Sequence, residues 1–330
     1  MSKSEHSKWV SKRPEMLPDF IIGGAMKSGT TTLHSILDQH PKVNLAHNEL
    51  GFFDIDSIIA HPDFSFFNSQ TKEWTTQSMK DNSEKLWKWY YSNFESKRSA
   101  GGIIGEDSTT YLSSSIAAKR IALQEKPIKM IFILRHPTSR SISNYLHALK
   151  SGRAIYNLED TLRYNPSSIL KRSMYKEQLE VYYKYLPSEQ IKVITFEDFI
   201  SNTKSCVLEV SDFLGIDFSE FKESDLKIHS NKTKIPKNEN LQLIRNRMLR
   251  YFGDTRYASH LPMCPSDVSG KVSFLHRLVD KIHNKVNPKQ SKVKYKPNPE
   301  TVAYLDAYFE TYMEGLNELV NKDITSNWFK

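Results

Sequence analysis

The sequence predicts an α/β fold, a three-layer sandwich in which a central, mostly parallel sheet is flanked by helices. The apolar runs at 20–22 and 129–134 are typical of buried strands, and residues 191–195 are predicted to form another strand. Each is followed by a segment with the i, i+3, i+4 apolar spacing of a helix that buries one face. Strands that alternate with helices form right-handed βαβ units, and these place ligands at the C-terminal edge of the sheet.

The turn between the first strand and the first helix is predicted to bind an anion. The apolar run at 20–22 ends at two glycines, and the helix that begins at Thr30 is stopped by Pro41. The first N–H groups of a helix lack intrahelical partners, and the helix dipole adds about half a positive charge. Lys27 supplies a full charge, so we expect a phosphate-bearing ligand. Because Lys27 precedes Gly29, the order K-S-G-T differs from a Walker A loop.

The remaining elements continue the alternation of strands and helices. We expect further strands at 103–106, 129–134 and 191–195, and helices at about 83–95, 114–124, 137–149, 173–186, 201–214, 241–251 and 298–319. The run KMIFIL at 129–134 is the strongest strand signal, because a continuous apolar run suits a parallel sheet covered on both faces. The aromatic helix near 83–95 is expected to pack against the sheet. Asn298 and Pro299 begin a last helix that closes the core.

The composition predicts one domain over residues 19–330, preceded by a flexible basic arm at 1–18 and carrying a variable, basic insert at about 235–297. The 46 basic and 38 acidic residues give a net charge of +8, which favours an anionic ligand or acceptor. Cys206 and Cys264 make no metal-spaced pair and favour a reduced compartment. Neither a signal peptide nor a run of about 20 apolar residues is recognised, so we expect a cytoplasmic protein without a transmembrane segment.

A second phosphate site is predicted at the end of the strongest strand. Arg135 ends that strand, and Ser143 follows eight residues later in the next helix. A guanidinium can bind a terminal phosphate through two parallel hydrogen bonds, to which a hydroxyl adds a third. Two phosphate sites at one sheet edge predict a ligand that is phosphorylated at both ends.

These motifs resemble those of the sulfotransferases that use 3′-phosphoadenosine 5′-phosphosulfate (PAPS), which share a P-loop-like fold. KSGTT at 27–31 is similar to their 5′-phosphosulfate loop, and LRHPTSRSISNY, with Arg135 and Ser143, is similar to their 3′-phosphate motif. ELGFFD at 49–54 and EDSTTYL at 106–112 resemble E-P-H-F-F-D and E-K-T-P-A-Y-F of the heparan sulfate 3-O-sulfotransferases. NKTK at 231–234 resembles a later cofactor-contacting stretch. The resemblance covers about 19–234 and 297–328.

The resemblance implies PAPS as the sulfuryl donor, adenosine 3′,5′-bisphosphate as the product, and no metal. Glu49 is the implied general base, and Lys27 is implied to stabilise the leaving phosphate. The implied cofactor-binding residues are Lys27, Ser28, Gly29, Thr30, Thr31 and Thr32 at the 5′-phosphate, Arg135 and Ser143 at the 3′-phosphate, and Lys232 and Thr233 over the nucleotide.

The acceptor side departs from the family pattern. The residues implied there are Gly51, Asp54, Glu106 and Asp107. The family has histidine where Gly51 stands and lysine where Asp107 stands, so a heparan-like acceptor does not follow. We expect sulfuryl transfer to a hydroxyl or amine of a carbohydrate or other small molecule. Glu106 either shares proton transfer with Glu49 or holds a neighbouring side chain.

Two other classes of function fit parts of the sequence. A P-loop nucleotide kinase would share the sheet and the phosphate loop, but the chain has no G-K-[ST] to place a hydroxyl on magnesium. A non-catalytic module could hold a polyanion on its basic surface, with an affinity that falls steeply with salt. We expect no nucleic acid partner.

Overall fold

The computed structural model describes residues 7–61, 66–68, 72–94, 101–228, 234–250, 274–290 and 295–329. The contacts divide the chain into two compact units, whereas the sequence predicts one domain after residue 18. Unit 1 comprises residues 1–136, 174–230 and 313–330, and unit 2 comprises 137–173 and 231–312. The region 235–297, for which the sequence predicts a variable insert, therefore belongs to unit 2.

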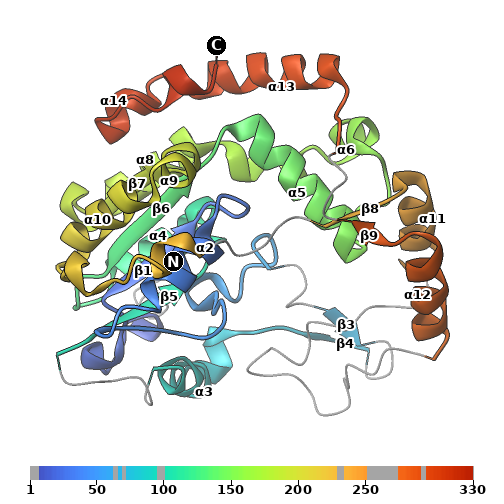
Figure 1. The fold of residues 1–330 in the computed structure, drawn as a ribbon. Helices are drawn as coiled ribbons and strands as arrows, with labels where there is room; N and C mark the ends of the chain where they lie inside the picture. The colour runs from blue at the N-terminus through green and yellow to red at the C-terminus, as the bar shows by residue number, and fades with distance from the viewer. Residues whose placement is uncertain are drawn as a thin grey trace. The chain divides into compact units, whose positions relative to one another are not determined.

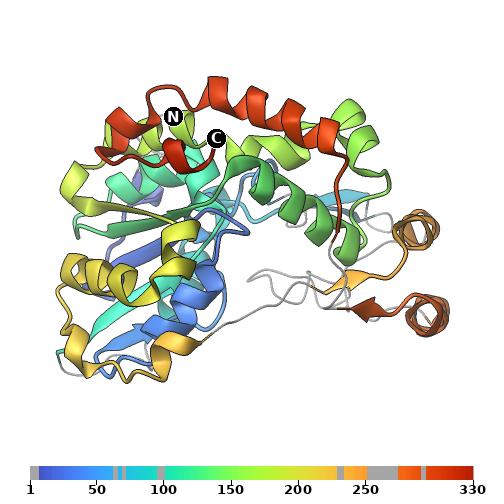
Figure 2. The same cartoon turned by 45° about the horizontal axis from the view of Figure 1, so that its top comes forward.

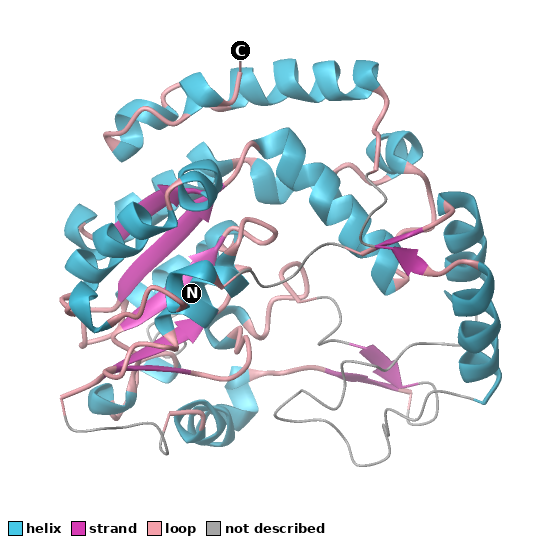
Figure 3. Cartoon of the chain, viewed as in Figure 1, coloured by secondary structure: helices cyan, strands magenta, loops and turns pink. Residues whose placement is uncertain are grey.

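Unit 1 is built on a five-stranded sheet in the order β2-β5-β1-β6-β7 (Figure 1). Each pairing in this sheet is parallel, as expected where helical crossovers connect the strands. The strands are β1 (Phe20–Gly24), β2 (Val43–Leu45), β5 (Ile103–Asp107), β6 (Lys129–Leu134) and β7 (Ile191–Thr195). The predicted parallel sheet is confirmed, and Figure 3 shows its strands in magenta beside the cyan helices.

Helices cover both faces of the sheet. On one face, α2 (Thr30–Leu37) and α10 (Thr203–Leu214) pack on a cluster of buried residues that includes Ile131 and Ile133. Phe132 alternates to the other face, where its ring lies 4.7 Å from that of Tyr182 on α8 (Tyr175–Tyr185). Helix α4 (Ser115–Ala122) packs beside α8. This arrangement confirms the predicted three-layer sandwich.

Unit 1 also contains elements outside the five-stranded sheet and the helices described above. They are α3 (Met79–Ser92), α9 (Phe196–Ser201), α14 (Leu316–Val320) and the antiparallel pair β3 (Phe66–Asn68) and β4 (Glu73–Thr75), which the sequence does not predict. Part of the expected flexible arm is packed in the structure. Trp9 is buried with the Arg120 guanidinium 3.5 Å above its ring, and Ser11 Oγ lies 2.6 Å from Tyr91 Oη. Only residues 1–6 of the predicted arm lie outside the described ranges.

Unit 2 has its own apolar core, formed where α5 and its neighbours bury residues such as Tyr145, Leu158 and Leu243. Its elements are α5 (Pro137–Ser151), α6 (Leu158–Tyr164), α7 (Ser167–Leu170), β8 (Ile235–Pro236), α11 (Glu239–Arg250), α12 (Phe274–Val286), β9 (Lys289–Gln290) and α13 (Pro299–Tyr312). Figure 2 shows α11 and α12 side by side, and an ion pair between Arg245 and Asp280 links them. Described parts of the predicted insert thus form ordered helices.

The last predicted helix is two helices in the structure. The apolar stripe predicts one helix over 298–319, but α13 ends at Tyr312 and α14 begins at Leu316. Gly315 between them has a φ of 81° and precedes the first residue of α14. Glycine adopts this left-handed conformation without the steric cost of a Cβ atom, so the chain can turn there.

Candidate active site

The predicted site residues of unit 1 lie at or just after the C-terminal ends of neighbouring strands. Glu49 comes after β2, Asp107 ends β5, Lys27 comes after β1 and Arg135 after β6, and these strands are adjacent in the sheet. Backbone hydrogen bonds connect the loops to the strands beside them: Ser108 donates to Ile22 at 3.0 Å. Because parallel strands end at the same edge, the fold gathers these residues at the edge where ligands are expected.

The loop between β1 and α2 has the features of an anion site. Lys27 and Gly29 have φ values of 72° and 94°, and Gly29 is the N-cap of α2. A Cβ atom at Gly29 would lie 3.0 Å from the ring of Phe196, so both the backbone conformation and the packing favour glycine. Ser28 is fully buried, and its hydroxyl has no hydrogen-bond partner among the described residues. A buried hydroxyl without a partner fits a site completed by a bound phosphate.

The threonines of this loop differ in their exposure. Thr30 is buried as the first residue of α2, Thr31 is exposed, and Thr32 is half-buried. The backbone N–H of Thr32 donates to the carbonyl of Gly29 at 2.9 Å, which closes the first turn of the helix.

Arg135 lies against the same loop. Its Nη1 donates to the carbonyl of Lys27 at 3.1 Å, and its guanidinium is 4.6 Å from the centre of the Phe196 ring. Burial lowers the pKa of Arg135, and the nearby Glu197 carboxylate opposes this shift. The stacking and the carbonyl contact hold the guanidinium in place beside the phosphate loop.

The segment 49–54 carries the implied base Glu49. Glu49 is exposed, and its Oε2 accepts a hydrogen bond from Thr109 Oγ1 at 2.9 Å. Phe52 is fully buried and stacks on Tyr90 of α3, with ring centroids 4.2 Å apart. The aromatic helix predicted near 83–95 therefore packs against the segment that bears Glu49.

Glu106 is fully buried beneath this segment. Its carboxyl accepts hydrogen bonds from Tyr90 Oη at 2.5 Å, Ser108 Oγ at 2.5 Å and Tyr111 Oη at 2.8 Å. Burial raises the pKa of Glu106 to about 7, and the three hydroxyl donors oppose the shift. Of the two roles left open for Glu106, this enclosure favours holding neighbouring side chains.

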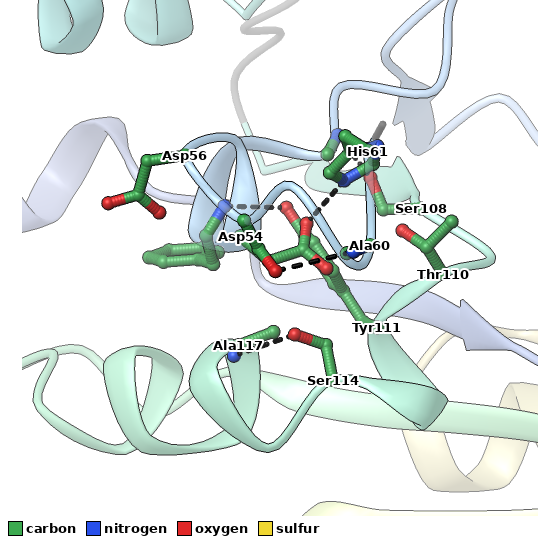
Figure 4. Close-up of polar contacts among 12 residues, drawn as sticks. Asp54, Asp56, Ala60, His61, Ser108, Thr110, Tyr111, Ser114 and Ala117 are labelled. Carbon is green, nitrogen blue, oxygen red and sulfur yellow. Dashed lines mark hydrogen bonds and ion pairs between the residues drawn. The ribbon is translucent and has the colours of Figure 1, made fainter. Parts of the chain in front are cut away.

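The other acceptor-side residues have histidine partners. Asp107 Oδ2 lies 3.6 Å from His34 Nδ1 on α2, and burial raises the pKa of Asp107 while His34 opposes the shift. Asp54 is fully buried, and its Oδ1 is 2.6 Å from His61 Nε2 (Figure 4). A Cβ atom at Gly51 would lie 2.9 Å from the His61 ring. His61 therefore occupies the space next to Gly51.

The structure brings together part of the predicted site. In unit 1 it joins Arg135 to the Lys27 loop, and Glu49 to the loop after β5. Ser143 is half-buried on α5 of unit 2. Lys232 and Thr233 lie outside the described residues. Sequence reasoning missed Phe196, His34 and His61, whose contacts with the site depend on tertiary structure, although the Asp54–His61 spacing within one loop was a usable local signal.

Metal binding and membrane spanning find no support in the described parts of the chain. Among their side chains, no three His, Cys, Asp or Glu groups are arranged to hold a metal ion. No helix in these parts combines the length and the hydropathy needed to cross a membrane.

Comparisons with known proteins point to one family. The profile described as "Sulfotransferase domain" matches residues 17–252. Membrane-associated sulfotransferase kil1 of Dictyostelium discoideum is 25% identical, over 72% of this chain and 63% of that protein. Human heparan sulfate glucosamine 3-O-sulfotransferase 5 is 27% identical, over 61% of this chain and 54% of that protein. Against these relatives the chain spans between about half and two-thirds of their length.

The fold has a similar solved structure. A sulfotransferase from Alicyclobacillus acidocaldarius superposes with a TM-score of 0.58 at 20% identity, covering 95% of this chain and 99% of that one. At this identity the likeness concerns the fold.

Proposed function

Because the chain belongs to the sulfotransferase domain family, we propose that it transfers a sulfuryl group from PAPS to a hydroxyl or amine of a carbohydrate acceptor. The observation that carries the proposal is the loop after β1. It combines a lysine, a helix N-terminus and a buried serine hydroxyl that has no partner among the described residues, and Arg135 donates to a carbonyl of this loop. PAPS supplies the sulfuryl group when bound, and adenosine 3′,5′-bisphosphate is released.

The residues of the chain would divide the work of this reaction. Lys27 and the N–H groups from Gly29 to Thr31 would hold the 5′-phosphate and neutralise the charge that develops on it. Arg135 and Ser143 would hold the 3′-phosphate, and Lys232 and Thr233 would cover the nucleotide. Glu49 would take the proton of the attacking hydroxyl or amine, because it is exposed and oriented by Thr109.

A carbohydrate acceptor is supported by the names of the heparan sulfate relatives. The acceptor side of this chain carries its own chemistry, however. Asp107 stands where the family segment that the sequence resembles has lysine, and its carboxylate lies 3.6 Å from the imidazole of His34. We therefore expect neutral or amino sugars to be better acceptors than highly sulfated chains.

Calorimetric binding of adenosine 3′,5′-bisphosphate tests the donor site, with ATP–magnesium as the comparison. We expect the bisphosphate to bind more tightly than ATP–magnesium, and Arg135→Ala to weaken bisphosphate binding about 10- to 100-fold because it removes charge-assisted bonds to a phosphate. Arg163→Ala is the control, since Arg163 also lies over an aromatic ring, 5.2 Å from that of Tyr164, but is not among the residues proposed to bind the cofactor. Tighter binding of ATP–magnesium would favour a kinase instead.

The acceptor is then sought with labelled PAPS. The panel contains a neutral oligosaccharide, an amino-sugar oligosaccharide, desulfated heparan sulfate and heparan sulfate. Label transfer to a sugar supports the proposal, while donor binding without transfer to any carbohydrate in the panel would contradict a carbohydrate acceptor.

A further inference from the structure

Two backbone N–H groups of the segment 49–54 are held by buried hydroxyls. The N–H of Gly51 donates to Ser108 Oγ at 2.9 Å, and the N–H of Phe53 donates to Tyr111 Oη at 3.0 Å. Both hydroxyls in turn donate to the same atom, Oε1 of Glu106, at 2.5 and 2.8 Å. One buried carboxyl oxygen thus connects to two points of the segment that carries Glu49.

The direction of each hydrogen bond is fixed by the chemistry of its groups. A backbone N–H can only donate, so each hydroxyl oxygen accepts from the segment and directs its own proton elsewhere. Glu106 Oε1 accepts the hydrogen bonds that both hydroxyls donate. Ser108, Tyr111 and Glu106 are all buried, so water has little access to replace a lost partner. Each chain of two hydrogen bonds therefore connects the segment to Glu106 through groups that water cannot easily replace.

The other oxygen of the same carboxyl has a different connection. Oε2 accepts from Tyr90 Oη at 2.5 Å, and the Tyr90 ring contacts the segment by stacking on Phe52. Removal of the Tyr90 hydroxyl would break a hydrogen bond as short as the one from Ser108 but would leave the stacking and both chains intact. Tyr90→Phe is therefore a matched control for variants that remove the hydroxyl of Ser108 or Tyr111.

We propose that Glu106 is a positioning residue that fixes Glu49 through the hydroxyls of Ser108 and Tyr111. Glu49 is two residues from Gly51, and Thr109, next to Ser108, donates directly to its carboxylate. The loop after β5 thus holds the segment at three points. This inference rests on the proposed role of Glu49 as the base.

The positioning does not require a charge on Glu106. Its carboxyl faces Tyr90, Ser108 and Tyr111, with Asp54 as the nearby acid. If a proton binds, Oε2 can carry it toward Tyr90 Oη while Oε1 still accepts from Ser108 and Tyr111. Glutamine can reproduce this pattern, with its carbonyl oxygen at Oε1 and its amide group toward Tyr90. Alanine cannot.

We call the two hydrogen-bond chains through Ser108 and Tyr111 the clamp. Amide hydrogen exchange at residues 51 and 53 tests the clamp and needs no sulfuryl acceptor. We expect Ser108→Ala to speed exchange at Gly51 and Tyr111→Phe to speed it at Phe53, each by about 10-fold, the loss of one net hydrogen bond. Tyr90→Phe should leave both amides at wild-type rates. If Tyr90→Phe speeds exchange as much as the other two variants, the network stabilises the region generally and the proposal is wrong.

Turnover tests whether the clamp serves Glu49. Transfer is measured with the panel acceptor of highest turnover and, as a second probe, with water, whose attack on PAPS releases adenosine 3′,5′-bisphosphate. We expect Ser108→Ala and Tyr111→Phe to lower kcat about 10-fold while the Kd for adenosine 3′,5′-bisphosphate stays unchanged. Glu106→Gln should keep more of the wild-type kcat than Glu106→Ala. Equal kcat in Ser108→Ala, Tyr111→Phe and wild type would overturn the proposal.

Glu49→Gln separates this inference from the proposed function. In that background, Ser108→Ala should cause no further loss of kcat, because both changes act through one group. If Glu49→Gln alone keeps the full rate, the base assignment fails. If Glu49→Gln is slow and Ser108→Ala slows it again by the full factor, the base assignment stands and the positioning role fails.

Discussion

At the scale of single residues, burial affects the pKa values of the acids at this site as much as neighbouring charges do. Glu106 and Asp107 are consecutive acids at the end of β5, and burial raises the pKa of both. Their partners differ, however. Glu106 is surrounded by hydroxyl donors, whereas Asp107 faces the imidazole of His34. Glu106 therefore accepts hydrogen bonds from three hydroxyls, whereas Asp107 connects the end of β5 to α2 through His34.

The raised pKa of Glu106 predicts a pH dependence of stability. Its folded-state pKa is about 7 against a usual value of 4.5, so between these pH values the folded protein holds a proton that the unfolded chain releases. The stabilisation is complete below about pH 4.5 and is lost as the pH rises through about 7. We expect the free energy of unfolding to fall by up to about 3 kcal/mol across this window through Glu106 alone.

Urea unfolding at pH 5 and pH 8 measures this effect in the wild type and in Glu106→Gln. The variant has no titrating group at this position, so its loss of stability from pH 5 to pH 8 should be smaller than that of the wild type. Asp107 titrates in both proteins and cancels in the comparison. Identical pH dependence in the two proteins would show that Glu106 ionises near its usual pKa.

The sequence predicted which residues belong to the candidate site better than it predicted which residues contact them. The motifs place Lys27 and Arg135 correctly after β1 and β6, which are neighbours in the sheet, because apolar runs and βαβ handedness can be recognised locally. The sequence placed Glu49 only just past the first helix, and it did not indicate the order of the strands. The contact of Phe196 with Gly29 and the pairing of His34 with Asp107 join residues far apart in the sequence. No local periodicity encodes such contacts, so a single sequence did not reveal them.

At the scale of elements, the strands were predicted better than the ends of helices. The predicted strands at 129–134 and 191–195 coincide with β6 and β7. The signal is strongest in β6, because a parallel strand that is covered on both faces has a nearly continuous apolar sequence. The last helix was predicted too long, since its apolar stripe continues past Gly315 although the backbone turns there. An apolar stripe reports burial, whereas helix ends depend on single backbone conformations.

The N-terminus of α2 predicts a specific effect of Gly29→Ala. Both Gly29 and Gly215 adopt positive φ at helix ends, with values of 94° and 78°. Alanine at either position should cost about 1 to 2 kcal/mol of stability through backbone strain. A Cβ atom at Gly215 meets nothing within 4 Å, whereas at Gly29 it would press on Phe196, over which Arg135 lies.

Only Gly29→Ala should therefore weaken the binding of adenosine 3′,5′-bisphosphate, by about 10-fold or more, given a loss of at least about 1.4 kcal/mol. Thermal unfolding and calorimetric titration of both variants check this prediction. A comparable loss of affinity in Gly215→Ala would indicate that general destabilisation, rather than the shape of the phosphate loop, controls binding.

At the scale of the whole molecule, the chain forms two units with separate apolar cores. Unit 1 buries apolar residues on both faces of its sheet, including the cluster beneath α2 and α10, and the core of unit 2 forms around α5. The sequence did not indicate this division, because α5 follows β6 directly and no linker composition marks the boundary at residue 136. Unit 2 is also assembled from two segments far apart in the chain, 137–173 and 231–312. From the sequence alone, most of the second segment was predicted to be an insert.

Separate cores predict separate responses to core substitutions. Leu158 and Ile133 are both fully buried, the first in unit 2 and the second in unit 1. Replacing either with alanine should cost about 2 to 5 kcal/mol in its own core. Hydrogen exchange should therefore rise in α5 and α11 for Leu158→Ala, and in β1 and β6 for Ile133→Ala. If each variant raised exchange equally in both sets of elements, the two units would unfold as one cooperative domain, as the sequence alone predicts.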